Sequence, residues 1–200
     1  MSIQNLVFDC GEVLLHFDLL AIARCFAETE DDAKILKEAF SSDWHCIDEG
    51  TMAYSDFCRT VLLQLPERLR EKAARMQQEW FLHQPAIPGM QEFLTEMQRT
   101  YDCYILSNAP SFFGRHLLEA VPAAAGVKGK LISGDVQLTK PNEAIYRLFL
   151  QRFRLKGEEC LFIDDRPENI AGAEAVGICG VVFDGNPETV RKRLKELERT

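Results

Sequence analysis

The chain has 200 residues, of which 46% are hydrophobic and 27% are charged, a composition typical of a globular protein with a substantial core. Its formal net charge is -8 at pH 7. Nucleic acids and anionic membranes bind clustered Lys and Arg, so this charge argues against either as the main partner. A small anionic ligand stays compatible with the sequence if local positive charge or a metal ion offsets its charge.

Seven cysteines are scattered along the chain without a CxxC pair. Such a set indicates free thiols in a reducing compartment and not a disulfide framework or a zinc site. The N-terminal stretch MSIQNLVFD has no basic region before its apolar residues, and no apolar run approaches the roughly 18 residues that span a bilayer. The sequence therefore predicts a cytoplasmic protein.

Five short apolar runs along the chain each end in polar residues. They are NLVF before Asp9, CYIL before Ser107, KLIS before Gly134, CLFI before Asp164 and CGVVF before Asp184. Short runs with both faces apolar are typical of central strands in a parallel sheet.

Helical patterns lie beside prolines between and after the later runs, over 89–100, 142–153, 168–176 and 188–198. Strands that alternate with helices predict an α/β fold with a doubly wound parallel sheet and right-handed crossovers.

The interval 17–85 has no strand-like run. It contains helical patterns instead, among them LLAIARCFAE, AKILKEAF, YSDFCRTVLLQL and RLREKAARMQQEWFL. A helical block that follows the first strand and ends at PAIPGM is typical of a cap inserted over a sheet. The sequence therefore predicts an α/β core of residues 1–16 and 86–200, with a small inserted helical cap over 17–85.

Polar residues at the ends of the predicted strands are expected to meet at one edge of the sheet. In an open doubly wound sheet, ligands bind beyond the carboxyl ends of the strands, where the strand order reverses. Asp9, Asp164 and Asp165 would lie there, and three carboxylates in a small volume call for a hard cation such as Mg2+. Ser107, a neighbouring backbone amide and Lys140 would complete a cradle for a phosphate dianion.

Four motifs resemble those of the haloacid dehalogenase (HAD) superfamily of phosphohydrolases. They are VFDCGEVL, ILSN, KPNEAIY and FIDDRPENIAGAEAVG. One such motif alone is a weak signal, but four in the right order, each at a predicted strand end or helix start, are specific. The resemblance covers essentially the whole chain and implies a HAD-like Rossmannoid core with the smaller type of cap.

The resemblance also implies roles for the acidic residues. Asp9 would be the nucleophile, attacking phosphorus in line to form an aspartyl-phosphate. Asp165 would be the principal carboxylate ligand of Mg2+, and Asp164 a second ligand, directly or through water. Asp9 and the backbone carbonyl of Gly11 would complete the metal site.

The remaining matched residues would bind phosphate or support the loops. Ser107 would donate its hydroxyl to a phosphoryl oxygen and Asn108 its backbone amide, although Ser-Asn-Ala-Pro also fits an ordinary turn. Lys140 would neutralise the phosphate and Asp9, whereas a lysine taken alone is more often a solvated surface charge. Asn169 would orient the loop that carries the acidic pair, or simply cap a helix.

Gly11 departs from the family pattern, in which an aspartate two residues after the nucleophile protonates the leaving oxygen. Glycine cannot do this, and loss of a general acid costs about 100- to 10,000-fold in rate. A subset of the family with glycine here includes bacterial alpha-D-glucose-1-phosphatase, which FDCGEVLLHFD resembles. The variant favours an acidic leaving group, such as that of a sugar-1-phosphate.

Three residues are considered as substitutes for the missing acid. Glu12 is expected to point away from the site because adjacent residues of an extended segment face opposite sides. His16 and His45 could reach the leaving group, although histidines at such positions are more often structural.

The stretch WHCIDEGTMAYSDF in the predicted cap combines Trp44, His45, Asp48 and Glu49 in what reads as a polar loop. We expect contacts to the leaving group there, from Trp44, His45 and Glu49. The alternative is a capping loop in which Trp44 fills the small core of the cap.

Together these features predict a Mg2+-dependent phosphomonoester hydrolase of a small phosphorylated metabolite, with a sugar phosphate favoured. Two alternatives are a 2-haloacid dehalogenase-like hydrolase and a catalytically weakened phosphate-binding protein. Dehalogenases need no metal and do not usually keep the acidic pair, so Asp164 and Asp165 favour the phosphatase. The sequence indicates no particular oligomeric state.

Overall fold

The computed structural model describes residues 2–199, and within them the chain forms a five-stranded parallel sheet in the order β3-β2-β1-β4-β5. All five apolar runs that were predicted to be strands are strands. They are β1 (Asn5–Phe8), β2 (Asp102–Ser107), β3 (Gly129–Ile132), β4 (Cys160–Asp164) and β5 (Cys179–Val182). The strand order reverses beside β1, so β1, β2 and β4 end next to one another.

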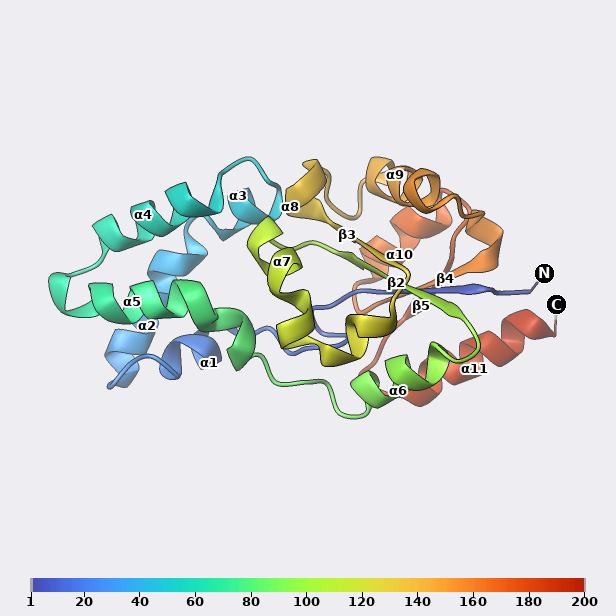
Figure 1. The fold of residues 1–200 in the computed structure, drawn as a ribbon, viewed down its shortest axis with the longest axis horizontal. Coiled ribbons are helices and arrows are strands. Elements are labelled where there is room, and N and C mark those ends of the chain that lie inside the picture. The colour runs from blue at the N-terminus through green and yellow to red at the C-terminus, as the bar shows by residue number, and fades with distance from the viewer. Residues whose placement is uncertain (1, 200) are drawn as a thin grey trace.

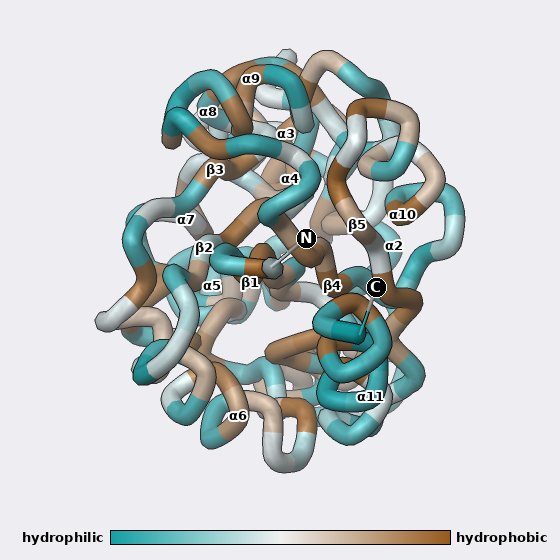
Figure 2. The backbone as a smooth tube through the Cα atoms, turned by 90° about the vertical axis from the view of Figure 1, so that its right-hand side faces the viewer, coloured by the Kyte–Doolittle hydropathy of each residue, from teal (hydrophilic) through white to brown (hydrophobic). Residues whose placement is uncertain are grey.

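Helices cover both faces of the sheet (Figure 1). Along β1, Leu6 and Phe8 join one hydrophobic cluster and Val7 joins the other, as the two-residue period of a strand requires. In the end-on view of Figure 2, the strands lie between helices above and below. The covering helices are α6 (Met90–Met97) and α11 (Pro187–Glu198) on one side, and α9 (Glu143–Phe153) and α10 (Pro167–Glu174) on the other.

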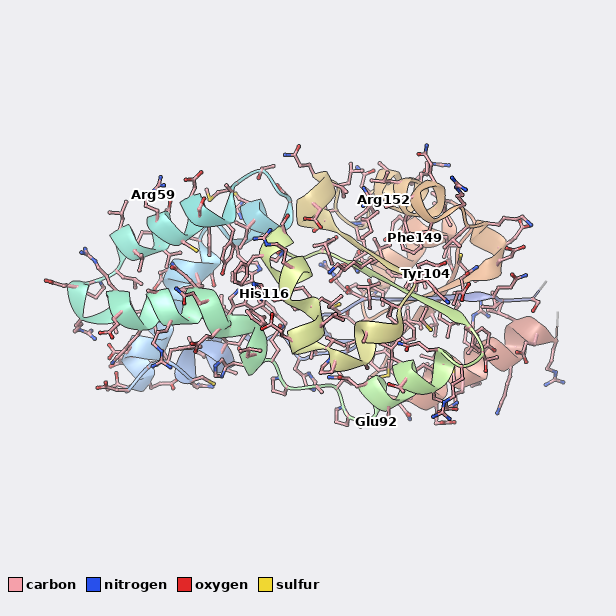
Figure 3. The ribbon with its side chains drawn as sticks, viewed as in Figure 1. Arg59, Glu92, Tyr104, His116, Phe149 and Arg152 are labelled. Atoms are coloured by element: carbon pink, nitrogen blue, oxygen red, sulfur yellow. The ribbon has the colours of Figure 1, made fainter. Side chains whose placement is uncertain are left out.

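Aromatic side chains pack α9 against the sheet. Tyr104 of β2 and Phe149 of α9, both labelled in Figure 3, have ring centroids 5.8 Å apart in an edge-to-face arrangement. Burial of both faces explains why the strands are continuous apolar runs, and the predicted doubly wound α/β fold is confirmed.

One long helix of the α/β part was not predicted. Helix α7 (Ser111–Ala120) follows β2 and buries Phe113, Gly114 and Leu117. Pro110 stands at its N-cap position, a feature that in the sequence reads equally well as a turn. The short helix α8 (Ser133–Val136) follows β3.

The interval between β1 and α6 is helical, as predicted, and it lies at the end of the molecule opposite both termini (Figure 1). One expectation within it is wrong: the stretch expected to be a polar loop begins with a helix, because the backbone amide of Glu49 closes a helical turn onto the carbonyl of His45. The elements are α1 (Leu19–Arg24), α2 (Glu30–Ser41), α3 (Trp44–Asp48), α4 (Tyr54–Gln64), α5 (Glu67–Glu79) and η1 (Trp80–His83).

The two segments that connect this helical block to the sheet run side by side. The amide of His16 donates to the carbonyl of Pro85 at 2.8 Å, and the amide of Ile87 donates to the carbonyl of Leu14 at 3.0 Å. These bonds lie where the sequence analysis puts the limits of the inserted block; the division into core and cap itself stays a prediction. Within residues 2–199, no helix has the length and apolar character needed to cross a bilayer.

Candidate active site

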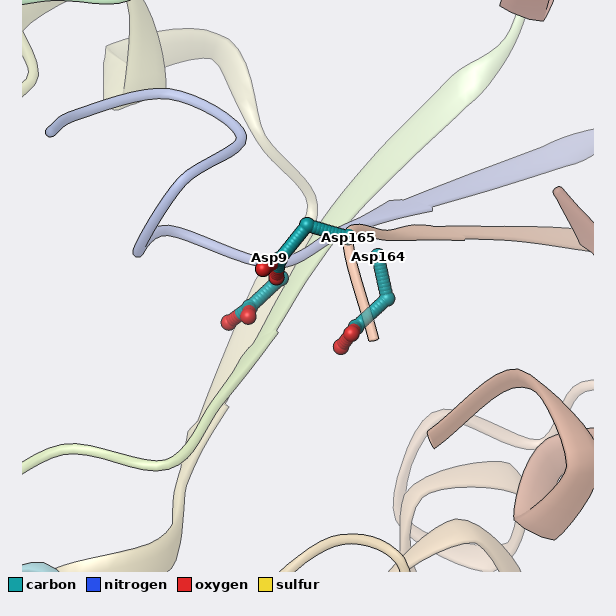
Figure 4. Close-up of side chains that lie close together, drawn as sticks. All are labelled: Asp9, Asp164 and Asp165. Atoms are coloured by element: carbon teal, nitrogen blue, oxygen red, sulfur yellow. The ribbon is translucent and has the colours of Figure 1, made fainter. Parts of the chain in front are cut away.

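Three aspartates meet at the carboxyl edge of the sheet (Figure 4). Asp9 follows β1, Asp164 ends β4 and Asp165 comes next, and carboxylate oxygens of the three lie within 4.8 Å of one another. Because β1 and β4 are hydrogen-bonded neighbours, strand pairing itself brings these side chains together. This is the cluster that the sequence predicted at the switch point of the sheet.

Lys140 supplies positive charge to this cluster. Its Nζ lies 2.9 Å from Asp9 Oδ1 and 2.7 Å from Asp164 Oδ2, and it also donates to the carbonyl of Leu106 at 3.2 Å. The side chain is 1% exposed. Burial opposes its charge, but Asp9 and Asp164 together raise the pKa of Lys140 above its ordinary value. The lysine therefore stays protonated beside the predicted nucleophile.

One lysine does not neutralise three carboxylates. The pKa of Asp9 is raised to about 6: burial raises it most, Lys140 opposes the rise, and the charge of Asp164 adds to it. The pKa of Asp165 is also raised, by burial and then by the charge of Asp164. With all three acids ionised the group carries two uncompensated negative charges, which is the charge and ligand chemistry that suits a divalent, oxygen-seeking cation.

Hydrogen bonds occupy the carboxylate of Asp164 on both sides. Its Oδ1 accepts from the backbone amide of Arg166 and from Asn169 Nδ2, each at 2.9 Å. Its Oδ2 accepts from Lys140 at 2.7 Å and from Asn169 Nδ2 at 3.0 Å. Asp9 and Asp165 therefore offer the more available oxygens for a metal, while Asp164 holds the lysine and the loop in place.

Asn169 has the orienting contacts expected from its position. Its amide nitrogen donates to Asp164, and its backbone carbonyl accepts the Tyr146 hydroxyl at 2.7 Å. The N-cap position of α10 belongs to Arg166, so capping does not account for Asn169. Its side-chain oxygen, Oδ1, is buried and finds no hydrogen-bond partner in the described part of the chain, which leaves an unused acceptor at the site.

Ser107 ends β2 beside the cluster, and Asn108 follows it. Ser107 is buried, and it lines the same cavity as Asp9. The Asn108 side chain binds the backbone of Lys140 twice, with Nδ2 donating to the carbonyl and Oδ1 accepting from the amide, both at 2.9 Å. The sequence analysis considered only the backbone amide of Asn108 and missed this contact, which fixes the segment that carries the lysine.

A cavity of about 460 Å³ opens between the sheet edge and the helical block. Asp164 does not line it, because that side chain is fully buried behind the cluster. The wall from the helical block includes Trp44, His45, Asp48, Glu49, Trp80 and Gln84.

Gly11 lines the cavity, and a Cβ built on it would meet no atom within 4 Å. Space therefore does not require glycine there. Glu12 has a φ of 53° and lies in a turn, so the expectation of an extended segment is wrong. Its carboxylate accepts from the amide of Phe17 at 2.8 Å and lies 3.1 Å from Nδ1 of His16, which does not line the cavity.

Trp44 combines the two interpretations that the sequence left open. Its ring centroid lies 5.0 Å from that of Trp80 and 5.3 Å from that of Phe17, and the side chain also lines the cavity. Sequence reasoning missed Trp80, which lies within a helical pattern, and Gln84, which follows it, because neither belongs to a recognisable motif and each reaches the cavity only through packing.

Comparison with known proteins gives a match to a family model described as "haloacid dehalogenase-like hydrolase", over residues 3–177. Phosphoserine phosphatase of Thermus thermophilus is 31% identical over 121 residues, which are 60% of this chain and 48% of that protein. The chain thus aligns with about half the length of this curated relative.

Solved structures share the fold. A HAD family enzyme of Bacteroides thetaiotaomicron, solved as a magnesium complex, superposes with a TM-score of 0.75 at 18% identity, covering 93% of this chain and 96% of that one. A complex of the same enzyme with magnesium and inorganic phosphate gives 0.72 at 18% identity and coverages of 92% and 96%. A dehalogenase with an intermediate complex gives 0.70 at 20% identity, covering 92% and 85%.

Proposed function

This chain belongs to the haloacid dehalogenase-like hydrolase family, and we propose that it is a Mg2+-dependent phosphomonoester hydrolase of a small phosphorylated metabolite. The observation that carries the proposal is the cluster at the sheet edge, where Asp9 lies beside a buried, protonated Lys140 and within reach of Asp165. Magnesium and phosphate in a structural relative agree with it.

The residues divide the chemistry between them. Asp9 attacks phosphorus in line and forms an aspartyl-phosphate, which water then hydrolyses. Asp9, Asp165 and the Gly11 carbonyl would hold Mg2+, with Asp164 as a further, indirect ligand; when bound, the ion neutralises charge on the phosphoryl oxygens. Lys140 holds the attacking carboxylate in place and balances the charge of the phosphate.

Phosphate contacts come from the end of β2. The hydroxyl of Ser107 and the backbone amide of Asn108 would donate to phosphoryl oxygens; they follow β2, on the other side of β1 from the acidic pair after β4. The side chain of Asn108 keeps Lys140 in register with them through its two backbone hydrogen bonds. Asn108 would therefore serve the phosphate site twice, through its own backbone amide and by holding the backbone of Lys140.

The helical wall supports a polyhydroxylated leaving group, so we favour a sugar phosphate, including a sugar-1-phosphate as in the glycine variants of the family. Trp44 and Trp80 offer aromatic faces, and Glu49 and Gln84 offer acceptor oxygens for hydroxyl donors. The cavity volume of about 460 Å³ suits a ligand of this size. We also propose that residues 17–85 act as a cap that selects the substrate.

Dehalogenation is the second candidate because a dehalogenase shares the fold. The charge of the site argues against it: a 2-haloacid brings its own carboxylate to a place where three carboxylates face one lysine. A phosphate ester that arrives with a divalent cation does not meet the same repulsion.

A substrate panel tests the proposal. Purified protein is assayed with sugar-1-phosphates, sugar-6-phosphates, phosphoserine, nucleotides and p-nitrophenyl phosphate, with Mg2+ or with EDTA, and halide release is measured from 2-haloacids. We expect phosphate release that needs Mg2+ and is abolished in Asp9→Asn. Binding of phosphate without hydrolysis of any ester would identify a phosphate-binding protein instead, and halide release without metal would identify a dehalogenase.

A further inference from the structure

The proposed hydrolysis leaves one proton unassigned. When the bond from phosphorus to the leaving oxygen breaks, the electron pair stays on that oxygen, and an alcohol leaves readily only if it is protonated at the same time. Gly11 has no side chain to do this. Either another residue supplies the proton, or only esters of acidic alcohols react.

The candidates named from the sequence are poorly placed for the task. The two carboxylate oxygens of Glu12 are directed to the amide of Phe17 and to the ring of His16. His16 itself does not line the cavity. His45 lines it, but this residue is exposed and its Nε2 lies 3.3 Å from the thiol of Cys46.

Asp48, the last residue of α3, fits better. It lines the same cavity as Asp9 and Gly11, from the opposite wall. One of its carboxyl oxygens, Oδ1, is buried and has no hydrogen-bond partner within residues 2–199. An unpaired buried oxygen of this kind disfavours the carboxylate and favours the protonated carboxyl.

The backbone of Asp48 is tied to the phosphate-binding side of the site. Its carbonyl accepts a hydrogen bond from Ser133 Oγ at 2.5 Å, and the same oxygen of Ser133 accepts from the amide of Ala109 at 2.9 Å. Ala109 follows Ser107 and Asn108 directly. A single hydroxyl therefore joins α3 to the loop that the proposed phosphate contacts occupy.

Gly50 and Gly134 let the end of α3 approach the segment after β3 this closely. A Cβ at Gly50, whose φ is +69°, would lie 2.5 Å from the carbonyl oxygen of Gly134. The carbonyl of Gly50 also accepts from Gln137 Nε2 at 3.0 Å. These contacts fix the position of Asp48 relative to the sheet edge.

The charges around Asp48 also suit a proton donor. Its pKa is raised to about 7: burial raises it most, the charges of Glu49 and Asp9 add to the rise, and a hydrogen bond with Trp44 opposes it. The other charged side chains that line the cavity are Glu12, His45, Lys140, Asp165 and Arg166. A carboxyl with this pKa is substantially protonated near neutral pH.

We propose that Asp48 is the catalytic acid that replaces the side chain missing at Gly11. As the oxygen of Asp9 bonds to phosphorus, the ester bond breaks and the leaving oxygen takes the proton of the Asp48 carboxyl, releasing an alcohol. The Asp48 carboxylate then accepts a proton from the water that attacks the aspartyl-phosphate, and inorganic phosphate leaves. This role rests on the proposed phosphatase function.

The consequence is a wider range of substrates than Gly11 alone predicts. With a donor on the helical wall, esters of ordinary alcohols react as well as those of acidic ones. Because the donor belongs to the helical block, the chemistry also depends on contact between α3 and the core.

A series of aryl phosphates, from p-nitrophenyl phosphate to phenyl phosphate, together with glycerol 2-phosphate, tests the role. Asp48→Asn is compared with wild type and with Asp43→Asn, a neighbouring acid before α3 whose side chain makes no capping bond. We expect Asp48→Asn to lower kcat by about 100-fold or more on glycerol 2-phosphate and by less than about fivefold on p-nitrophenyl phosphate. Asp43→Asn should match wild type throughout.

A second variant tests whether Asp48→Asn loses activity through the missing proton donor and not through a change in the fold. Gly11→Asp has open space for its side chain, and in the Asp48→Asn background it should restore turnover of glycerol 2-phosphate by at least about tenfold. Equal loss on every ester, or no loss on glycerol 2-phosphate, would overturn the role of Asp48. A wild-type protein that hydrolyses none of these esters would instead overturn the phosphatase function itself.

Discussion

The two walls of the cavity differ in how their charged groups are paired. On the sheet wall, Lys140 bridges Asp9 and Asp164, and Asn169 donates to both oxygens of Asp164. On the helical wall, Asp48 Oδ1 and Gln84 Oε1 are buried and have no partner among the described residues, whereas on the sheet wall this holds for the uncharged Asn169 Oδ1. The first wall is a preorganised charge network, and the second presents unpaired oxygens whose partners a ligand would supply.

This difference suits the sheet wall to the chemical step and the helical wall to contact with the leaving group. A preorganised network positions the nucleophile without reorganisation during the reaction, which is where electrostatic catalysis gains most. Unpaired groups cost stability in the free protein, and such costs are concentrated where function needs them. Substitutions on the sheet wall should therefore destabilise the fold, whereas substitutions on the helical wall should leave it as stable or more so.

The largest effect is expected for Lys140→Met. It leaves Asp9 and Asp164 as a buried pair of acids without their partner, which should lower the free energy of unfolding by about 3 to 5 kcal/mol near neutral pH. Urea denaturation followed by circular dichroism measures this. Phosphate release should fall below detection together with stability.

Lys128→Met is the matched control. Its ion pair with Asp102 is exposed on both sides, with side chains 59% and 55% accessible. Such pairs contribute about 0 to 1 kcal/mol. If both methionine variants lost the same stability, the sheet wall would not be the preorganised element described above.

Asp48→Asn should have the next largest effect, in the opposite direction. The pKa of Asp48 is about 7 in the folded protein against 3.8 for the free side chain, so the folded state holds the proton more tightly. Stability therefore falls as pH rises from about 4 to about 7, and the full penalty is present above that range. Asparagine removes the charge, so it should stabilise the protein by about 1 to 3 kcal/mol at pH 8, allowing for partial solvent access.

The pH dependence of the stability gain distinguishes removal of the Asp48 charge from any other effect of the asparagine side chain. The gain from Asp48→Asn should shrink to almost nothing near pH 4, where the wild-type carboxyl is already protonated in both states. Asp43→Asn should give no such trend. Thermal melts of the three proteins at several pH values measure the difference, and a gain that does not vary with pH would contradict the raised pKa.

Most of the sheet wall could be predicted from the sequence because strands determine it. Asp9 and Asp164 end continuous apolar runs, and parallel strands bring their carboxyl ends to one edge. Lys140 and Asn108 were found through motifs, but their mutual hydrogen bonds were not, since they are 32 residues apart in the chain. Pairing of side chains from different motifs appears only after folding.

The helical wall was predicted less well, for a related reason. Helical periodicity shows which face of a helix is buried, but not which residues reach a cavity shared with another part of the chain. Gln84 and Trp80 carry no motif, and Ser133 looks like an ordinary residue after a strand. The contact of Ser133 with Asp48 joins positions 85 residues apart.

Ser133→Ala tests whether that contact positions Asp48. It removes the bonds to the carbonyl of Asp48 and from the amide of Ala109, at a cost of about 1 to 2 kcal/mol of stability. If α3 shifts as a result, kcat on glycerol 2-phosphate should fall by about tenfold. Activity on p-nitrophenyl phosphate should change much less, and Ser55→Ala, at an exposed position in α4, should change neither.

Gln84→Leu should have the smallest effect on the fold and tests recognition alone. Leucine is close in size to glutamine and removes the unpaired Oε1, so stability should stay the same or rise by up to about 1 kcal/mol. If Gln84 accepts a substrate hydroxyl, KM for the best sugar phosphate should rise by about five- to tenfold, and by less for p-nitrophenyl phosphate, which has no hydroxyl. Gln78→Leu, at an exposed position in α5, is the control. Equal changes in KM for both esters would mean that Gln84 shapes the cavity without contacting the leaving group, so that Asp48 would be the one of these two residues that acts on the leaving group.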